Sequence, residues 1–188
     1  IRAMMRIVVI DPQPAVRAGL AMMLRTEPGL VPVGVAGTAK DGLELVERQR
    51  PDVALVDAGD LGLVRKLRAL DQPPRVVVYA AVDDPIFGVT ARVAGADGLV
   101  SKTAEADVLY AALRAVGRGG TARPPLDRDA MDAAAHRVEP EDLALLAMLV
   151  DRTEPSEVAA TLRLNPRKMA RRIERLLARL RPPRPATA

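Results

Sequence analysis

Five short apolar runs alternate with segments of helical periodicity along the first two thirds of the chain. The runs cover residues 6–10, 30–36, 52–57, 75–80 and 97–101. They lack alternation of polar and apolar residues, as expected of strands in a parallel sheet that is covered on both faces. Between them, apolar residues recur at helical spacing around 16–24, 43–46, 63–67, 84–94 and 105–116. The alternation predicts a doubly wound α/β domain with a five-stranded parallel sheet over residues 5–118.

A second pattern begins after residue 118. Glycine and proline reach linker density in GRGGTARPPLDRD, and we place a linker over 119–138. Three helical segments follow, and they cover residues 139–150, 154–164 and 165–180. The last carries one apolar stripe, formed by Met169, Ile173, Leu176, Leu177 and Leu180. The pattern predicts a small all-α domain over 139–180, followed by a proline-rich tail, 181–188, that we expect to be disordered.

Composition excludes or disfavours several classes of protein. Only 2% of residues are aromatic, so the stacking platforms of single-strand nucleic-acid binders are scarce. The absence of cysteine excludes disulfides and thiolate metal sites and is compatible with a reducing cytoplasm, the location that we expect. No apolar run approaches the roughly 20 residues of a membrane span, so we expect no membrane partner.

The net charge of +4 is distributed unevenly. From Arg163 to Arg184 there are nine basic residues and one acid, a net charge of +8, which leaves the rest of the chain at −4. A basic block at one end of a chain is typical of a nucleic-acid contact. The alternative is a solvated helix face in a protein rich in arginine.

The functional crevice of an open parallel sheet lies beyond the carboxyl ends of its strands. Asp11, Asp57, Ala80 and Lys102 all fall at such ends. In order and spacing, the segments VVIDPQPAVRAGLAMML, PDVALVD, VVVYAAVDDP and AGADGLVSK resemble the receiver domain of response regulators, which has a flavodoxin-like fold. The resemblance implies that Asp57 is the phosphoacceptor position and that Lys102 is the lysine of its pocket.

The pocket departs from the pattern of that family at three positions. A receiver holds Mg²⁺ with a pair of acids after its first strand, and here Pro12 takes the second place. The hydroxyl residue that binds the phosphoryl oxygens is replaced by Ala80, and the aromatic residue before the pocket lysine by Leu99. Because Mg²⁺ demands a nearly complete oxygen shell, we expect no cofactor beyond weak Mg²⁺ binding at Asp11 and Asp57.

We therefore expect a degenerate receiver that acts independently of phosphorylation, as a module for dimerisation or for sensing a ligand. One alternative is a conventional phosphorylated switch at Asp57, for which Asp60 is a substitute metal ligand. Another is that Asp57 and Lys102 form an ion pair that stabilises the crevice. The sequence leaves open whether a sensor kinase or a small-molecule effector acts on the chain.

The last two helical segments, joined by the turn LRLN, resemble the helix-turn-helix output domain of LuxR/NarL-type regulators. Asn165 and Pro166 start the second helix as N-cap and first residue. The resemblance implies contact with duplex DNA through Arg163, Arg167, Lys168, Arg171, Arg172, Arg175 and Arg179. We expect Arg171 and Arg172 to read base edges, and Arg163 and Arg179 to hold phosphates.

The family usually adds a fourth output helix that pairs the subunits, whereas this chain continues into RPPRPATA. We therefore expect a homodimer formed through the receiver, with Ile86, Val89, Val108 and Leu109 as candidates. His136, the one histidine, is expected to be exposed near the linker. The sequence predicts a DNA-binding transcription regulator that is not an enzyme; a receiver-linked RNA-binding antiterminator is the alternative from another class.

Overall fold

The computed structural model describes residues 4–81 and 84–181. Within these ranges the chain forms two compact units that are not continuous in sequence. The first unit contains residues 4–81 and 96–123. The second unit contains residues 84–95 and 124–181. We call them the sheet unit and the helical unit. No helix in the described part of the chain is both long enough and apolar enough to cross a membrane.

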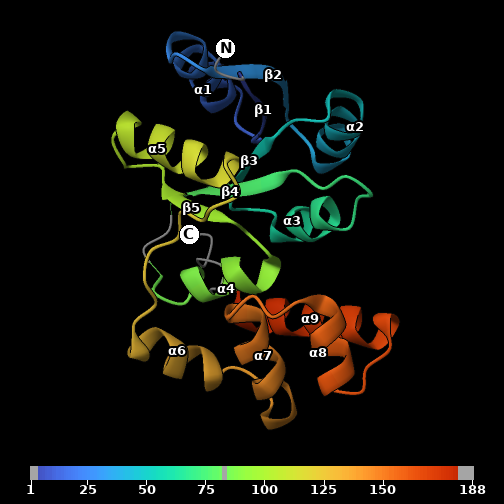
Figure 1. Ribbon diagram of the computed structural model, residues 1–188. Coiled ribbons are helices and arrows are strands. Elements are labelled where there is room, and N and C mark those ends of the chain that lie inside the picture. The colour runs from blue at the N-terminus through green and yellow to red at the C-terminus, as the bar shows by residue number, and fades with distance from the viewer. Residues whose placement is uncertain (1–3, 82–83, 182–188) are drawn as a thin grey trace, which may run out of the picture. The chain divides into compact units, whose positions relative to one another are not determined.

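The sheet unit contains one parallel sheet in the order β2-β1-β3-β4-β5 (Figure 1). Its strands are β1 (Met5–Ile10), β2 (Leu30–Ala36), β3 (Val53–Asp57), β4 (Arg75–Ala80) and β5 (Gly98–Ser101). Helices α1 (Pro14–Thr26) and α5 (Ala106–Gly117) cover one face, and α2 (Ala39–Gln49) and α3 (Leu61–Arg68) cover the other. The strands are buried because both faces are covered, which explains their unbroken apolar sequence.

Short polar residues start the helices on the second face of the sheet. The Thr38 hydroxyl accepts a hydrogen bond from the Asp41 amide at the start of α2, and the Asp60 carboxylate accepts one from the Leu63 amide at the start of α3. Each satisfies an amide that has no partner within its helix. These caps end the loops after β2 and β3, so they also fix the rim of the crevice.

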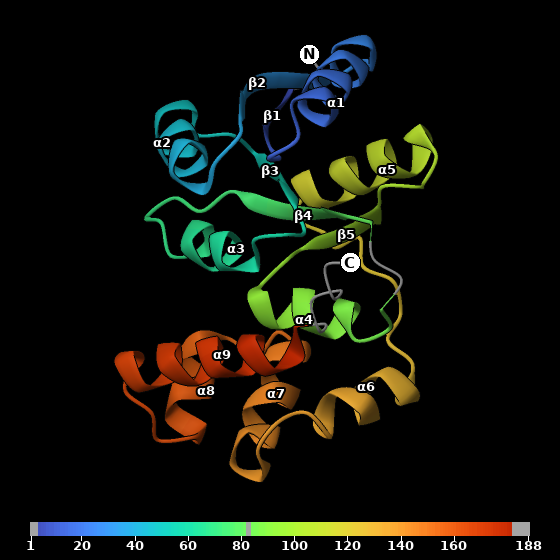
Figure 2. The same ribbon diagram turned by 180° about the vertical axis from the view of Figure 1, so that it is seen from behind.

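The described residues of the helical unit form α4 (Phe87–Ala94), α6 (Arg128–Ala135), the 3₁₀ turn η1 (Pro140–Asp142), α7 (Leu143–Val150), α8 (Pro155–Thr161) and α9 (Pro166–Leu180). Helix α4 lies beside α9 and α7 within this unit (Figures 1 and 2). Its end is set by Gly95, which adopts a left-handed backbone conformation with φ of 96°. The unit therefore draws one helix from the middle of the sequence.

The five predicted strands and the sheet class are confirmed. The boundaries between parts of the chain differ from the sequence-based ones at two places. Helix α4, which we placed in the domain 5–118, belongs to the helical unit, and α6 (Arg128–Ala135) lies within the linker predicted over 119–138. The Asp127 carboxylate caps α6 by accepting a hydrogen bond from the Ala130 amide, a signal that the surrounding prolines obscure. Residues 182–188 of the predicted tail lie outside the described residues.

Candidate functional site

Three charged side chains meet at the carboxyl ends of the strands in the sheet unit. Asp11 follows β1, Asp57 ends β3 and Lys102 follows β5. The Lys102 Nζ lies 2.7 Å from Asp11 Oδ2 and 2.5 Å from Asp57 Oδ1. The lysine thus bridges two carboxylates that would otherwise repel each other at the edge of the sheet.

The remaining carboxylate oxygens of this cluster accept hydrogen bonds from the backbone. The Gln13 amide donates to Asp11 Oδ1, and the Gly59 amide donates to Asp57 Oδ2 at 2.8 Å. A Cβ atom at position 59 would lie 2.8 Å from Asp57 Oδ2, so a larger residue here would displace this carboxylate. The Asp11 side chain is 2% exposed and that of Asp57 is 20% exposed. Asp57 is therefore the more accessible of the two.

The electrostatics of the cluster favour a charged lysine. Burial alone would lower the pKa of Lys102, but the hydrogen bonds and charges of Asp11 and Asp57 outweigh this effect and raise the pKa above its usual 10.5. The Tyr79 ring adds a weak cation–π contact, with its centroid 5.7 Å from Nζ. Lys102 is thus a fixed positive charge at neutral pH.

The oxygen donors at this site do not fit the usual Mg²⁺ shell. Mg²⁺ takes six oxygen ligands in near-octahedral geometry, whereas Asp11 and Asp57 both bind Lys102 and the adjacent position is Pro12. At the end of β4, Ala80 offers no side-chain oxygen. Among residues 4–81 and 84–181, no group of three or more His, Cys, Asp or Glu side chains is arranged to hold a metal ion.

A cavity of about 260 Å³ opens beside Asp57. It is lined by Ile10, Pro12, Gly37, Thr38, Ala39, Val56, Asp57, Gly59, Asp60 and Leu63. The lining combines apolar side chains with a few polar groups, and the cavity is slightly smaller than the roughly 300–1,000 Å³ of sites for drug-sized ligands. The Asp60 carboxylate is occupied in capping α3, which holds it at the rim.

In the helical unit, α9 carries its basic residues in two rows. Its start is fixed by Asn165, whose side chain accepts a hydrogen bond from the Lys168 amide at 2.9 Å. Along the helix, positions spaced i, i+4, i+7 and i+11 share one face. One row contains Arg167, Arg171, Glu174 and Ala178; the other contains Lys168, Arg172, Arg175 and Arg179. The apolar stripe forms a third face of α9, which points into the interior and buries Ile173 and Leu176.

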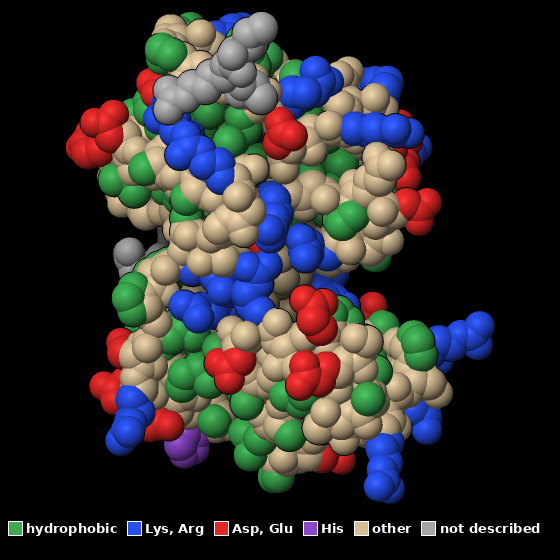
Figure 3. Space-filling view, in the orientation of Figure 1, with side chains coloured by type: hydrophobic (Ala, Val, Ile, Leu, Met, Phe, Trp, Pro, Cys, Tyr) green, Lys and Arg blue, Asp and Glu red, His purple; other side chains and the backbone are tan. Residues whose placement is uncertain are grey.

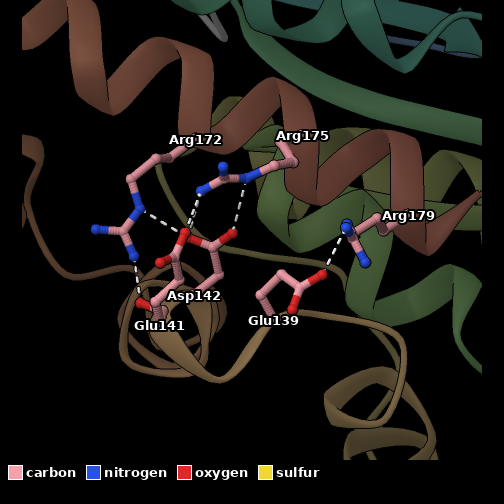
Figure 4. A network of polar contacts seen from close by, with 6 residues as sticks. All are labelled: Glu139, Glu141, Asp142, Arg172, Arg175 and Arg179. Atoms are coloured by element: carbon pink, nitrogen blue, oxygen red, sulfur yellow. Dashed lines mark hydrogen bonds and ion pairs between the residues drawn. The ribbon is translucent and has the colours of Figure 1, made fainter.

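The second row is bound to acids from the segment before α7 (Figure 4). Arg172 Nε donates to Asp142 Oδ1 at 2.6 Å, and Arg175 Nε donates to Asp142 Oδ2 at 3.1 Å. Arg172 also donates to the Glu141 carbonyl, and Arg175 pairs with the Glu141 carboxylate at 2.9 Å. The hydrogen bond and charge of Asp142 raise the pKa of Arg175.

Asp142 is the centre of this arrangement, because its side chain is 0% exposed and accepts from two guanidinium groups. A further ion pair, between Arg179 and Glu139 at 2.6 Å, continues the row towards the end of α9. Buried carboxylates are stable only when they are paired and hydrogen-bonded. The second row therefore fastens α9 to η1.

The first row and the start of the helix face solvent. Arg167, Lys168 and Arg171 are exposed, as is Arg163 in the turn before α9. Arg163 has a left-handed backbone conformation, with φ of 50°, which reverses the chain between α8 and α9. Lys and Arg side chains project from the surface where α8 and α9 meet (Figure 3). This is the part of the helical unit best placed for an extended anionic partner.

A family model described as the response regulator receiver domain matches residues 7–114, more than half of the chain. The chain belongs to the response regulator receiver family. The nitrate/nitrite response regulator NarL of Escherichia coli K12 is 32% identical over 118 residues, covering 60% of this chain and 55% of NarL. The match thus spans about half the length of that relative.

Longer matches extend into the helical unit. The DNA-binding transcriptional activator DevR/DosR of Mycobacterium tuberculosis H37Rv is 28% identical, over 94% of this chain and 88% of that protein. The chain is also similar to a solved structure of RcsB from Salmonella enterica serovar Typhimurium bound to promoter P1flhDC. The superposition has a TM-score of 0.61 with 17% sequence identity, and it covers 94% of this chain and 92% of the RcsB chain. At that identity the likeness to RcsB shows the fold.

In this response regulator the predicted crevice residues lie together, because Lys102 contacts Asp11, Asp57 and Ala80. The ion pair between Asp57 and Lys102, which was one of the alternatives, is present. The expectation that Arg171 and Arg172 share one role does not fit their contacts, because only Arg172 is tied to Asp142. Asp142 was not among the site residues predicted from the sequence, because nothing local in the chain marks it as a partner of the arginines of α9. His136 is exposed, as expected, and its Nδ1 lies 2.6 Å from the Asp132 carbonyl oxygen.

The residues proposed for a dimer through the receiver differ in exposure. Ile86, Val89 and Leu109 are at most 3% exposed, because they lie in the interiors of their units. Val108 is 53% exposed on α5. Three of the four candidates are therefore unavailable to a second copy in this conformation, and of the four only Val108 is on the surface.

Proposed function

We propose that this response regulator is a transcription regulator that binds duplex DNA through α8 and α9. The observation that carries the proposal is the exposed row on α9, in which Arg167 and Arg171 lie one turn apart next to Lys168. A capped, basic helix after a short helix and a tight turn suits the major groove, where arginine recognises guanine by two hydrogen bonds. The names of DevR/DosR and of the promoter-bound RcsB support the same function.

The division of α9 into two rows refines the roles of its basic residues. Arg167 and Arg171 are assigned to base edges, because neither forms an ion pair with an acid among the described contacts and both are exposed to solvent. Lys168 and Arg163 are assigned to phosphates beside the groove. Arg172, Arg175 and Arg179 serve mainly to hold α9 against η1, so their contribution to DNA binding is indirect.

We also propose that the receiver acts without phosphorylation of Asp57. Phosphoryl transfer to a carboxylate needs cationic groups to offset the three phosphoryl oxygens, and here Lys102 is shared with Asp11. Ala80 supplies no hydroxyl, and Pro12 supplies no second acid. The cavity beside Asp57 gives this receiver a place for a small effector, and Val108 on α5 gives a candidate contact for a second copy.

Binding to labelled duplex and structured RNA, measured by fluorescence anisotropy, tests the function. We expect the protein to prefer duplex DNA that has been selected from a random pool, with affinity that falls as salt rises because phosphate contacts release counterions. Preference for structured RNA over every duplex would replace the DNA-binding proposal with the antiterminator alternative.

The phosphorylation proposal has a separate test. Intact mass after incubation with Mg²⁺ and a small-molecule phosphodonor should show little or no phosphate on the protein. Stoichiometric, Mg²⁺-dependent phosphorylation that is lost in Asp57→Asn would show that the conventional switch operates.

A further inference from the structure

Helix α4 is buried on nearly all sides. Six of its eight residues are buried: Phe87, Val89, Thr90, Ala91, Val93 and Ala94. A helix that is apolar around most of its circumference lies inside a protein rather than on its surface. Within the helical unit its neighbours are α9, α7 and α6 (Figures 1 and 2). It is therefore part of the interior of that unit.

Hydrogen bonds and close packing join α4 to the rest of the helical unit. The Thr90 hydroxyl, which donates to the Ile86 carbonyl at 3.0 Å, also lies 3.4 Å from the carbonyl of Leu180, the last residue of α9. Arg92 donates to the Pro124 carbonyl at 2.7 Å. A Cβ at Gly88 would lie 3.1 Å from the Leu126 side chain, so the segment before α6 approaches α4 closely.

The apolar stripe of α9 needs this neighbour. Ile173, Leu176, Leu177 and Leu180 are all at most 5% exposed. Among the described elements, none packs against α9 as extensively as α4 does. The ion pairs from Glu139, Glu141 and Asp142 hold a different face of α9. Its position is thus set by acids on one side and by α4 on the other.

We propose that α4 is a structural member of the DNA-binding unit and that it fixes the position of α9. The inference rests on the proposed function of α9 in reading duplex DNA. The unit is then discontinuous in sequence, and the fragment that follows residue 123 lacks one helix of its own core. Along the chain, α4 lies between β4, which ends at Ala80, and β5, which precedes Lys102.

Hydrogen exchange measured by mass spectrometry on the full-length chain tests this assignment. Thr90→Glu places a charge in the packing between α4 and α9, and Thr90→Val keeps the shape of the side chain without its hydroxyl. Ala112→Glu in α5 is the matched control, because Ala112 is 8% exposed and belongs to the core of the sheet unit. Thr90→Ala gives a milder perturbation at the same place.

We expect Thr90→Glu to speed exchange of α9 and α7 amides by about tenfold or more, and Thr90→Ala by about threefold, with smaller changes in β1 and β3. Thr90→Val should change exchange of α9 by less than about twofold. Ala112→Glu should affect the strands more than α9. Unchanged α9 exchange in Thr90→Glu, or equal acceleration of strands and α9 in Thr90→Ala, would overturn the proposal.

The same variants separate this inference from the proposed function. Exchange reports the structure of α9 whether or not the protein binds DNA. If α9 depends on α4 but the wild-type protein binds no duplex, the structural assignment stands and the DNA-binding function fails. If the wild type binds a selected duplex and Thr90→Glu binds it equally well, α4 does not control the reading helix.

Discussion

The ion pairs around Asp142 give the sharpest prediction about stability, because the charges differ in exposure. Asp142 is fully buried, whereas the side chains of Arg172 and Arg175 are 20% and 43% exposed. Removing both guanidinium groups with Arg172→Met and Arg175→Met leaves a buried carboxylate without the cations that it binds. The free energy of unfolding should fall, because breaking a pair of this kind from one side leaves the buried carboxylate uncompensated.

Asp142→Asn is expected to cost less, about 1–2 kcal/mol. It removes the buried charge itself and keeps the shape of the side chain, and the two arginines can turn towards water. Adding Asp142→Asn to the double arginine variant should therefore restore part of the lost stability. This order of effects follows from burial alone and would not arise if the pairs were solvated surface contacts, which contribute about 0–1 kcal/mol.

Urea unfolding followed by far-ultraviolet circular dichroism measures these differences, and exchange of the α9 amides identifies the transition of the helical unit. Arg167→Met with Arg171→Met is the matched control, since it removes two arginines from the exposed row of the same helix. The control should change stability by less than about 0.5 kcal/mol. The reasoning fails if the control is as destabilising as Arg172→Met with Arg175→Met, or if Asp142→Asn costs more than that pair.

Three further predictions concern single residues. Lys102→Met should lower the free energy of unfolding by about 3 kcal/mol near neutral pH, because Asp11 stays buried without its cation. The pKa of Lys102 is raised in the folded protein, so its stabilising effect is fully present below pH 10.5 and is lost as the pH rises through the folded-state pKa. Urea unfolding of wild type and variant should therefore give the same free energy in strong alkali. Thr38→Ala should destabilise the sheet unit by about 1 kcal/mol through loss of the α2 cap, and a melting temperature equal to wild type would show that the cap is dispensable. Arg163→Gly keeps the left-handed turn and should weaken binding to all duplexes alike, with a salt slope lower by about one unit; a selective loss for one sequence would assign Arg163 to base reading instead.

The sheet could be predicted from the sequence because its signal is local. The strand at 53–57 is buried on both faces, so every residue of VALVD before the aspartate is apolar, and turn residues mark its ends. Strand ends then place Asp11, Asp57 and Lys102 at one edge without any knowledge of packing. The bridging position of Lys102 between two carboxylates follows from this placement.

The features that the sequence did not reveal depend on distant partners. Arg171 and Arg172 are neighbours with the same chemistry, and only the position of Asp142, thirty residues earlier, distinguishes them. The apolar pattern of α4 indicates burial but does not say which unit buries it. Both features require the tertiary structure, since neither periodicity nor composition identifies a partner across the chain.

The measurement that tests the central claim most directly is the ratio of affinities for a selected duplex and a scrambled duplex, in wild type and in Arg171→Ala. The exposed row should read base edges, so Arg171→Ala should lower this ratio by about fivefold to a hundredfold, corresponding to about 1–3 kcal/mol of discrimination. A variant that loses affinity for both duplexes in equal proportion, with the ratio unchanged, would contradict the account and reduce the basic helix to a general electrostatic contact.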